Sequence, residues 1–448
     1  MTGGRAQVLQ PARVSDHPPA RGISYNQEQI CLLSAFYPRN QAYNAQATIH
    51  IRGELDLVCL ERAVTHVIDR HEMLRTTISL GSSGYLATVH EPFPFDIPFH
   101  DLSGLPEPER QQALEELRLA RQHQVFDPAT LPLLSIDAVR LAPGAWTLIQ
   151  VEHHAVHDGW SFGRFWEEVQ AAYNALAAGL RPDLPPVPAQ YQQFVSWQRG
   201  RMEGEYGREA VDFWADYLDG AGEVTVGGPP TRVDSLDGHN LEATLPAESF
   251  GRIRDTARRL AVSPFVLMLG VYAQMLAEKS GETDFCVGTA VNARTETDLE
   301  PMLGMVVNTM PVRVRVPEGG PPADVFRGVQ RSLFRALRYN DVPLSLMVRQ
   351  LKTAQRPGRN PVFQHCFSFH DSQVPRLELG NCAAEIREGQ NHTAKFDMNV
   401  VVIPPSPTRD AGHARMFWQF SRSVFSRAEA VALVRDYEQL LERVLREP

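Results

Sequence analysis

The sequence predicts a mixed α/β (α+β) protein built as two lobes. Its 448 residues exceed the roughly 250 to 300 at which one hydrophobic core stops growing. Helix and strand patterns occur both before and after residues 181–188, where four of eight residues are proline. Such a segment forms a stiff connector rather than part of a core. We therefore expect a flexible tail over 1–22, a first lobe over 23–181 and a second lobe over 182–448.

The first lobe has a clear alternation of helix and strand. Apolar residues recur at helical spacing from Leu57 to Ile68, after a helix cap at Asp56. Residues 146–154 have the composition of a strand, and a helix follows with Ser161 as its expected cap. Side chains alternate along a strand, so the adjacent histidines at its end point to opposite faces. These histidines therefore lie at a strand-to-helix turn.

The second lobe mixes the same two kinds of element. Ser263 and a following proline open a helix, and Gly281 comes directly after its end. Residues 285–291 form a buried apolar run, and residues 306–316 alternate with several β-branched side chains, so both segments are predicted strands. The last helix carries apolar side chains near the end of the chain.

Composition excludes several classes of protein. A net charge of -9 and a pI near 5.9 argue against nucleic-acid binding, which needs a basic surface. The five cysteines are scattered and mostly lie in apolar runs, which indicates buried free thiols. The first 22 residues lack the apolar core of a signal peptide, and no apolar run reaches the length of a membrane span. We expect a cytoplasmic protein with no membrane and no nucleic-acid partner.

The candidate chemistry lies in residues 153–159, with the sequence HHAVHDG. A neutral imidazole accepts a proton near neutral pH, so His154 is the proposed general base for an attacking amine or alcohol. Asp158 is near enough to order the turn, by accepting backbone N–H bonds or by pairing with an arginine. Gly159 allows close backbone approach, so we expect its amide to help hold the oxyanion of a tetrahedral intermediate. The competing explanation of this segment is purely structural: a capped strand-to-helix turn that contains a buried histidine.

Other chemistries find less support in the sequence. His153, His154, His157 and Asp158 are four metal-ligating types within six positions, but adjacent strand histidines point apart, which suits one tetrahedral ion poorly. We find no glycine-rich phosphate loop, no Gly-x-Ser-x-Gly elbow and no dinucleotide fingerprint. We therefore predict acyl transfer, with no metal and no bound cofactor.

Residues 153–159 resemble the HHxxxDG signature of condensation domains from nonribosomal peptide synthetases. Further family motifs occur in the expected order over roughly residues 23–446, and this ordered co-occurrence is specific. The matching segments are residues 24–29, residues 70–76 (RHEMLRT), residues 191–198, residues 287–294, residues 304–309, residues 341–343 and residues 359–364.

The resemblance implies a V-shaped pair of lobes, each similar to a chloramphenicol acetyltransferase subunit, with a tunnel between them. It also implies that carrier-bound phosphopantetheine arms meet at His154, with a peptidyl carrier protein as partner and a small amine or alcohol as acceptor. In such enzymes the aspartate is structural and pairs with the arginine matching Arg70, and His153 is a packing residue. The resemblance leaves two roles open for His154: general base, or positioning of the nucleophile with stabilisation of charge. Arg294 and Asn308, in later motifs, are candidate substrate-binding residues.

Two departures from the family pattern concern the acceptor side. Met305 and Val306 stand where the family usually has two phenylalanines, and residues 290–292 (Ala-Val-Asn) replace a commoner Pro-Val-Ala. The sequence contains no recognisable adenylation or carrier segment, so we expect it to resemble the free-standing condensation enzymes of secondary metabolism; a domain excised from a megasynthase would give the same pattern. Some of the free-standing enzymes join a carrier-bound β-amino acid to an enediyne core as an ester.

Three rival functions share parts of this pattern. A CoA-dependent acyltransferase of the HxxxD type lacks the RHExLRT block that is present here. An epimerisation domain has the double histidine but inverts a stereocentre. A non-catalytic recruitment domain of the same fold typically loses the second histidine or the Asp-Gly pair, and this sequence keeps both.

Overall fold

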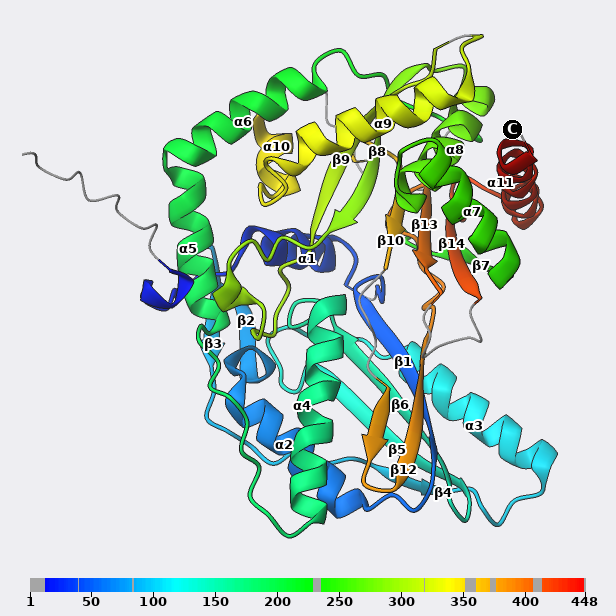
Figure 1. Cartoon of the computed structure of the whole chain (residues 1–448). Helices are drawn as coiled ribbons and strands as arrows, with labels where there is room; N and C mark the ends of the chain where they lie inside the picture. Colours follow the sequence, from blue (N-terminus) through cyan, green and yellow to red (C-terminus); the bar gives the residue numbers. More distant parts are fainter. Residues whose placement is uncertain are drawn as a thin grey trace, which may run out of the picture.

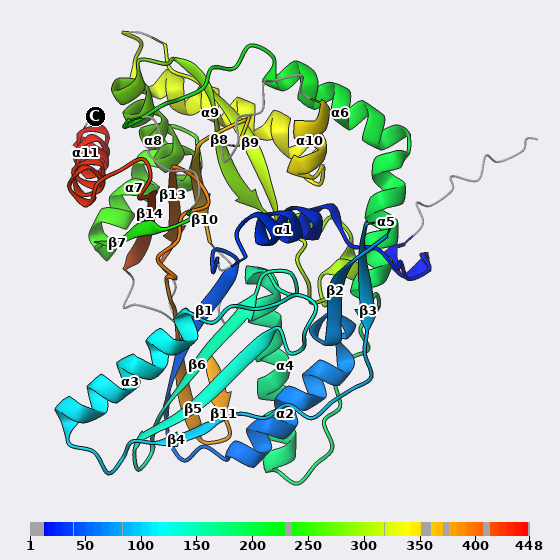
Figure 2. The same ribbon diagram turned by 180° about the vertical axis from the view of Figure 1, so that it is seen from behind.

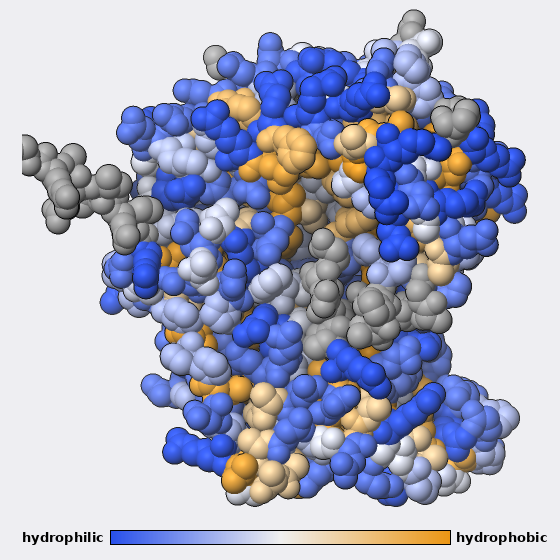
Figure 3. Space-filling model, in the orientation of Figure 1, coloured by the Kyte–Doolittle hydropathy of each residue, from blue (hydrophilic) through white to orange (hydrophobic). Residues whose placement is uncertain are grey.

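Two six-stranded sheets organise the chain into two lobes (Figure 1). The computed structural model describes residues 13–38, 40–82, 84–228, 235–317, 319–350, 360–370, 376–405 and 413–446. Figure 3 shows that hydrophilic residues cover most of one face, with smaller hydrophobic areas between them. The predicted mixed α/β fold with two lobes is confirmed.

The first lobe has the strand order β11-β12-β1-β6-β5-β4. Helices α2 and α4 pack on one another and on this sheet, and α3 lies beside it (Figures 1 and 2). A two-stranded hairpin, β2 with β3, adjoins the lobe. The bounds are β1 Asn44–Arg52, β2 Thr76–Gly81, β3 Gly84–Val89, β4 Phe99–Asp101, β5 Leu134–Ala142, β6 Ala145–His153, β11 Leu377–Leu379, β12 Cys382–Glu388, α2 Leu57–Arg70, η2 Glu72–Arg75, α3 Glu107–Gln122 and α4 Gly159–Ala177.

The second lobe has the strand order β7-β14-β13-β10-β8-β9. Helix α8 is the most buried of its helices and packs against α7, α9 and α11. The bounds are β7 Gly238–Leu245, β8 Asp284–Val291, β9 Asn308–Arg315, β10 His365–Phe369, β13 Met398–Ile403, β14 Ala414–Ser421, α7 Ala247–Arg259, α8 Pro264–Ser280, η3 Thr297–Leu299, α9 Pro322–Leu337, α10 Leu344–Gln350 and α11 Arg427–Arg446.

The lobe boundary differs from the expected division at residue 181. Strand β12 leaves the second lobe and pairs with β1 in the first, with Ala47 opposite Glu388, and the chain then returns to β13. β12 alternates buried and exposed residues, as a strand of a sheet with one solvated face should. The second segment therefore completes the first sheet, and the two lobes are interlocked.

The amino-terminal segment also differs from expectation. We predicted a flexible tail over residues 1–22; within it, Val14 of η1 (Val14–Asp16) is fully buried, and Ser15 donates to Asp298. Two helices, α5 (Tyr191–Glu203) and α6 (Glu205–Leu218), run beside the two lobes, and η1 packs on α5. The folded chain thus includes residues 13–22, because an apolar side chain there fills a small core.

Most local predictions are confirmed. Asp56 caps α2, Ser263 caps α8, Gly281 ends α8 in the left-handed conformation, and β6 and β8 lie where strands were expected. Ser161 is not the cap of α4; its backbone N–H instead donates to the cap, Asp158. The five cysteines are buried free thiols, as predicted.

Within the described residues, no single helix has the length and hydropathy to cross a membrane. One pair, α7 and α8, meets those limits only when joined across a 95° bend.

Candidate active site

The HHAVHDG segment forms the turn from β6 into α4. β6 ends at His153, and α4 begins at Gly159 with Asp158 as its N-cap. Helix α1 (Tyr25–Phe36) supports the turn from the motif that begins at Ser24. Ser24 and Gln27 form a capping box, and the Gln27 amide donates to the Ala155 carbonyl at 2.7 Å. A fully buried polar side chain thereby fixes the backbone beside the candidate base.

His154 is held by two contacts that define its chemistry. Its backbone N–H donates to the Tyr43 carbonyl at 2.7 Å, and its ring Nδ1 lies 3.2 Å from the His157 carbonyl. A carbonyl oxygen only accepts, so Nδ1 carries the proton in the neutral ring and Nε2 keeps a free lone pair. Burial, with the positive charge of Lys395 nearby, holds the pKa of His154 well below its ordinary value. The ring is therefore a neutral proton acceptor at pH 7.

The two flanking histidines lie in the interior. His153 is buried on the other side of the turn, where its Nδ1 accepts the Ala155 N–H, and burial lowers its pKa to about 4. His157 lies 3.3 Å from the Glu152 carboxyl group, and burial lowers its pKa to about 4 as well. Burial raises the pKa of Glu152 to about 8, so the pair is uncharged at neutral pH.

Asp158 ties the first lobe to the second. Its carboxylate accepts from both terminal nitrogens of Arg294, at 2.7 and 3.1 Å, and from the backbone N–H groups of Val306 and Val307. It also accepts from the backbone and hydroxyl of Ser161. Burial alone would raise the pKa of Asp158, but Arg294 and these donors hold it well below its usual range. The aspartate is a structural anion with no free oxygen to offer a substrate.

Arg70 does not pair with Asp158, which corrects the expectation drawn from the family resemblance. Its guanidinium donates to Glu168 at 3.0 Å, and His71 contacts the same carboxylate oxygen. Glu168 lies ten residues along α4 from Asp158, or about 15 Å at 1.5 Å per residue. Arg70 ends α2 beside the middle of α4, so only the nearer carboxylate is within its reach.

The two candidate substrate-binding residues serve the fold in this structure. Arg294 is 1% exposed, and its remaining donors reach Ser161 and carbonyls of the 299–304 loop. Asn308 is buried, and its amide donates to the carbonyls of Asn340 and Val342. Arg294 also lines the second cavity, whereas both amide hydrogens of Asn308 are taken by backbone carbonyls.

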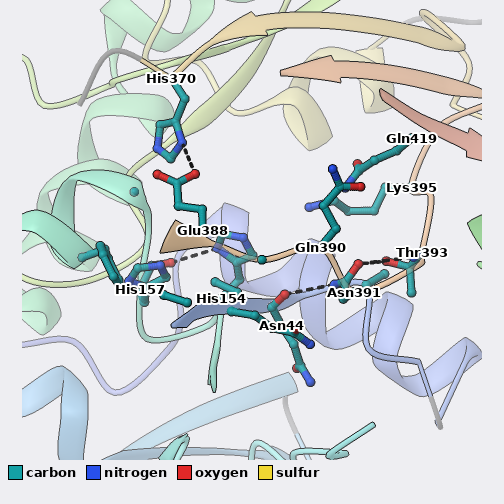
Figure 4. Close-up of a pocket in the computed structure, with 17 residues that line it drawn as sticks. Asn44, His154, His157, His370, Glu388, Gln390, Asn391, Thr393, Lys395 and Gln419 are labelled. Carbon is teal, nitrogen blue, oxygen red and sulfur yellow. Dashed lines mark hydrogen bonds and ion pairs between the residues drawn. The ribbon is translucent and has the colours of Figure 1, made fainter. Parts of the chain in front are cut away.

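A cavity of about 190 Å³ opens beside His154 between the two lobes (Figure 4). A second, larger cavity of about 530 Å³ lies on the far side of Gly159. Gly159 and His370 line both cavities. A Cβ on Gly159 would overlap the His370 ring, so a larger residue there would require His370 to move. The first cavity is lined by Ala42, Asn44, Ala45, Gln46, Ala47, His154, His157, Gly159, Phe162, His370, Glu388, Gly389, Gln390, Asn391, Thr393, Lys395 and Gln419.

Some of the residues that depart from the family pattern line a cavity, and others do not. Ala290, Val291 and Asn292 line the second cavity. Val306 is instead buried in a small core, and neither it nor Met305 lines either cavity. Of the motif at residues 359–364, Arg359 lies outside the described residues.

Three titratable residues of the cavity, His370, Glu388 and Lys395, were not found from the sequence. His370 follows β10 and lies 3.2 Å from Glu388 at the end of β12, and Lys395 lies in the return segment to β13. They come together because β12 crosses between the lobes. For His370 the only sequence signal is a polar residue directly after an apolar strand, which is common in loops; Glu388 ends β12 itself and Lys395 lies in the following loop.

Comparison with known proteins agrees with these motifs and this geometry. A family model, Condensation domain, matches residues 22–448. The chain belongs to the condensation domain family. This condensation domain is 30% identical over 404 residues to phosphinothricin tripeptide synthetase PhsC of Streptomyces viridochromogenes, covering 89% of this chain and 37% of the relative. It therefore spans well under half the length of that curated protein.

Solved structures of condensation-type domains have the same fold. The starter condensation domain of rhizomide synthetase superposes with a TM-score of 0.84 at 21% identity, covering 96% of this chain and 95% of that domain. The X-domain from teicoplanin biosynthesis gives a TM-score of 0.82 at 22% identity, covering 98% and 97%, and it has also been solved as a complex with OxyB. These similarities establish the fold of this condensation domain.

Proposed function

We propose that the protein is an acyltransferase that moves an aminoacyl group from a carrier-protein thioester to an amine or alcohol, forming an amide or an ester. The observation that carries the proposal is His154: a neutral imidazole with its Nδ1 proton engaged and its Nε2 free, on the wall of an inter-lobe cavity. Relatives named as peptide synthetases support the carrier-bound donor. The donor arrives on phosphopantetheine as a substrate.

The proposed reaction needs one proton acceptor and one oxyanion partner. The nitrogen or oxygen of the acceptor substrate attacks the thioester carbon, and the proton of that amine or alcohol passes to Nε2 of His154. The oxyanion faces the N–H of Gly159, the first residue of α4, where helix N–H groups lack intrahelical partners. When the intermediate collapses, the C–S bond breaks and the pantetheine thiolate leaves, taking the proton back from His154.

The proposal covers both products, an amide or an ester, and the esters include one formed with an enediyne core. A CoA-dependent transferase of the HxxxD type is a competing assignment. A panel of aminoacyl-loaded carrier proteins and matching CoA thioesters, offered with amines and alcohols, tests both by mass spectrometry of the product. Carrier-dependent transfer supports the proposal, whereas transfer from CoA alone supports the rival.

A recruitment domain is the second candidate, favoured by the similarity to the X-domain over 98% of the chain. It predicts binding of a partner protein with no transfer from any donor. Retention of His154 and the Asp158–Gly159 pair at an open cavity favours the enzyme.

A further inference from the structure

Lysine is rare in this chain, and one of its lysines lines the cavity beside His154. Of 44 lysines and arginines, only Lys279, Lys352 and Lys395 are lysines. Lys279 lies on the surface and pairs with Asp436. Lys395 lies in the segment between β12 and β13 and lines the cavity (Figure 4). A compact ammonium thus occupies a position inside the protein, in a chain that otherwise uses guanidinium groups.

The positively charged side chain of Lys395 contacts an aromatic ring but, among the described residues, has no anionic partner. Its Nζ lies 4.7 Å from the centre of the Tyr43 ring, and that ring meets the His154 ring edge-on at 6.3 Å between centres. Among the described residues no carboxylate pairs with Lys395, and the cavity's one acidic side chain, Glu388, lies 3.2 Å from His370. In Figure 4 the nearest labelled side chains are the amides of Gln390 and Gln419.

Burial of the Lys395 ammonium is unfavourable in free energy unless an anion pairs with it. Burial lowers the pKa of Lys395 to about 8, which means that removal from water disfavours the ammonium. The charge of Lys395 also lowers the pKa of His154, and after burial it is the largest cause of that lowering. A carboxylate at Lys395 would compensate the ammonium and weaken its repulsion of the imidazolium that forms during transfer. Neutral amide groups around it can donate to the second carboxylate oxygen.

We propose that Lys395, with the amides of Gln390 and Gln419, forms a subsite in the His154 cavity for a substrate that carries a carboxylate. The carboxylate belongs either to the side chain of the donor aminoacyl group or to a free acid on the acceptor. This inference rests on the proposed acyl transfer for its reaction but not for its binding site. Carboxylate binding is therefore measurable without turnover.

The first test observes Lys395 directly in the full-length protein. Reductive ¹³C-methylation labels three lysines and the amino terminus, and Lys395→Met identifies the Lys395 signal. N-acetylglycine and N-acetyl-β-alanine should shift this signal and raise the pKa of Lys395 above about 8, whereas their carboxamides should not. Lys395→Met should weaken binding of the acids about tenfold or more. Lys395→Arg should retain part of it, and Lys279→Met should leave it unchanged.

Three results would overturn the subsite. One is equal binding of acids and carboxamides, and another is a Lys395 signal that no acid moves. Unaltered acid binding by a folded Lys395→Met variant would likewise contradict it and leave Lys395 as a packing partner of Tyr43.

The second test separates donor from acceptor. Aspartyl- and glutamyl-loaded carriers are compared with asparaginyl- and glutaminyl-loaded ones, and amino acid acceptors with their carboxamides. The charged member of one pair should have the lower KM, and Lys395→Met should remove that difference. No turnover with intact carboxylate binding would overturn the proposed function alone, and turnover without charge preference would overturn the subsite alone.

Discussion

At the scale of single residues, the protonation state of His154 is set by its neighbours. The His157 carbonyl fixes the proton on Nδ1, and burial with Lys395 keeps the ring neutral. Strand alternation predicted that one of the two adjacent histidines faces a cavity, and the structure places His154 there and buries His153. The sequence was insufficient to find Lys395, since that residue reaches the cavity through a long-range crossing of the chain.

The pH dependence of transfer follows from this protonation state. A pKa of His154 well below 6.5 keeps the base active as the pH falls, so the acid limb of kcat/KM against pH should lie below pH 6.5. Lys395→Met removes a positive charge and should move that limb toward higher pH. A limb at or above pH 6.5 in the wild type, unmoved by Lys395→Met, would contradict the electrostatic account.

At the scale of elements, the β6–α4 turn buries imidazoles that are uncharged in the folded state. His153 and His157 have folded pKa values of about 4, against about 6.5 in the unfolded chain. Both contribute stability that is present above pH 6.5 and lost as the pH falls toward 4. The raised pKa of Glu152 has the opposite sign and offsets one of the two.

His154, whose pKa also lies well below its ordinary value, adds a loss of the same sign. We therefore expect the free energy of unfolding to fall by about 2 to 4 kcal/mol between pH 7 and pH 5. Urea denaturation at the two pH values measures this change. The exposed His123 offers a control, because His123→Gln should leave the pH dependence unaltered. Equal stability at pH 7 and pH 5 would show that these imidazoles are not buried in neutral form.

Asp158 joins α4 to the second lobe through Arg294 and the 306–307 backbone. Asp158→Ala leaves the buried Arg294 without its anion and should destabilise the protein by about 3 to 5 kcal/mol. Thermal unfolding of Asp158→Ala measures this loss. Glu167, exposed and paired with Arg164 on the same helix, is the matched control, and Glu167→Ala should cost about 1 kcal/mol or less.

A small effect of Asp158→Ala on unfolding, combined with a large loss of transfer, would instead assign Asp158 a direct part in the chemistry. The sequence predicted a structural aspartate but the wrong arginine. Helix caps and strand periods are local, whereas the ion-pair partner depends on where α2 meets α4, which no local pattern specifies.

At the scale of the whole molecule, the cavity depends on the interlocking of the lobes. Two sheets were predictable from the alternating patterns and the proline-rich connector. The crossing of β12 was not, because a strand of seven residues has the same alternation whichever sheet it joins. That crossing brings Glu388 to the cavity beside His370 and places Lys395 on the side opposite His157, and so completes the site (Figure 4).

The most direct test of the central claim compares aminoacyl transfer by the wild type and by His154→Asn, using aminoacyl-loaded carrier proteins with amine and alcohol acceptors. Asparagine can still donate to the His157 carbonyl but cannot accept the nucleophile's proton. We predict transfer by the wild type and a loss of about 10² to 10⁴-fold in the variant, with an unchanged melting temperature. Equal transfer rates for a folded His154→Asn variant and the wild type would contradict the assignment of His154 as the base.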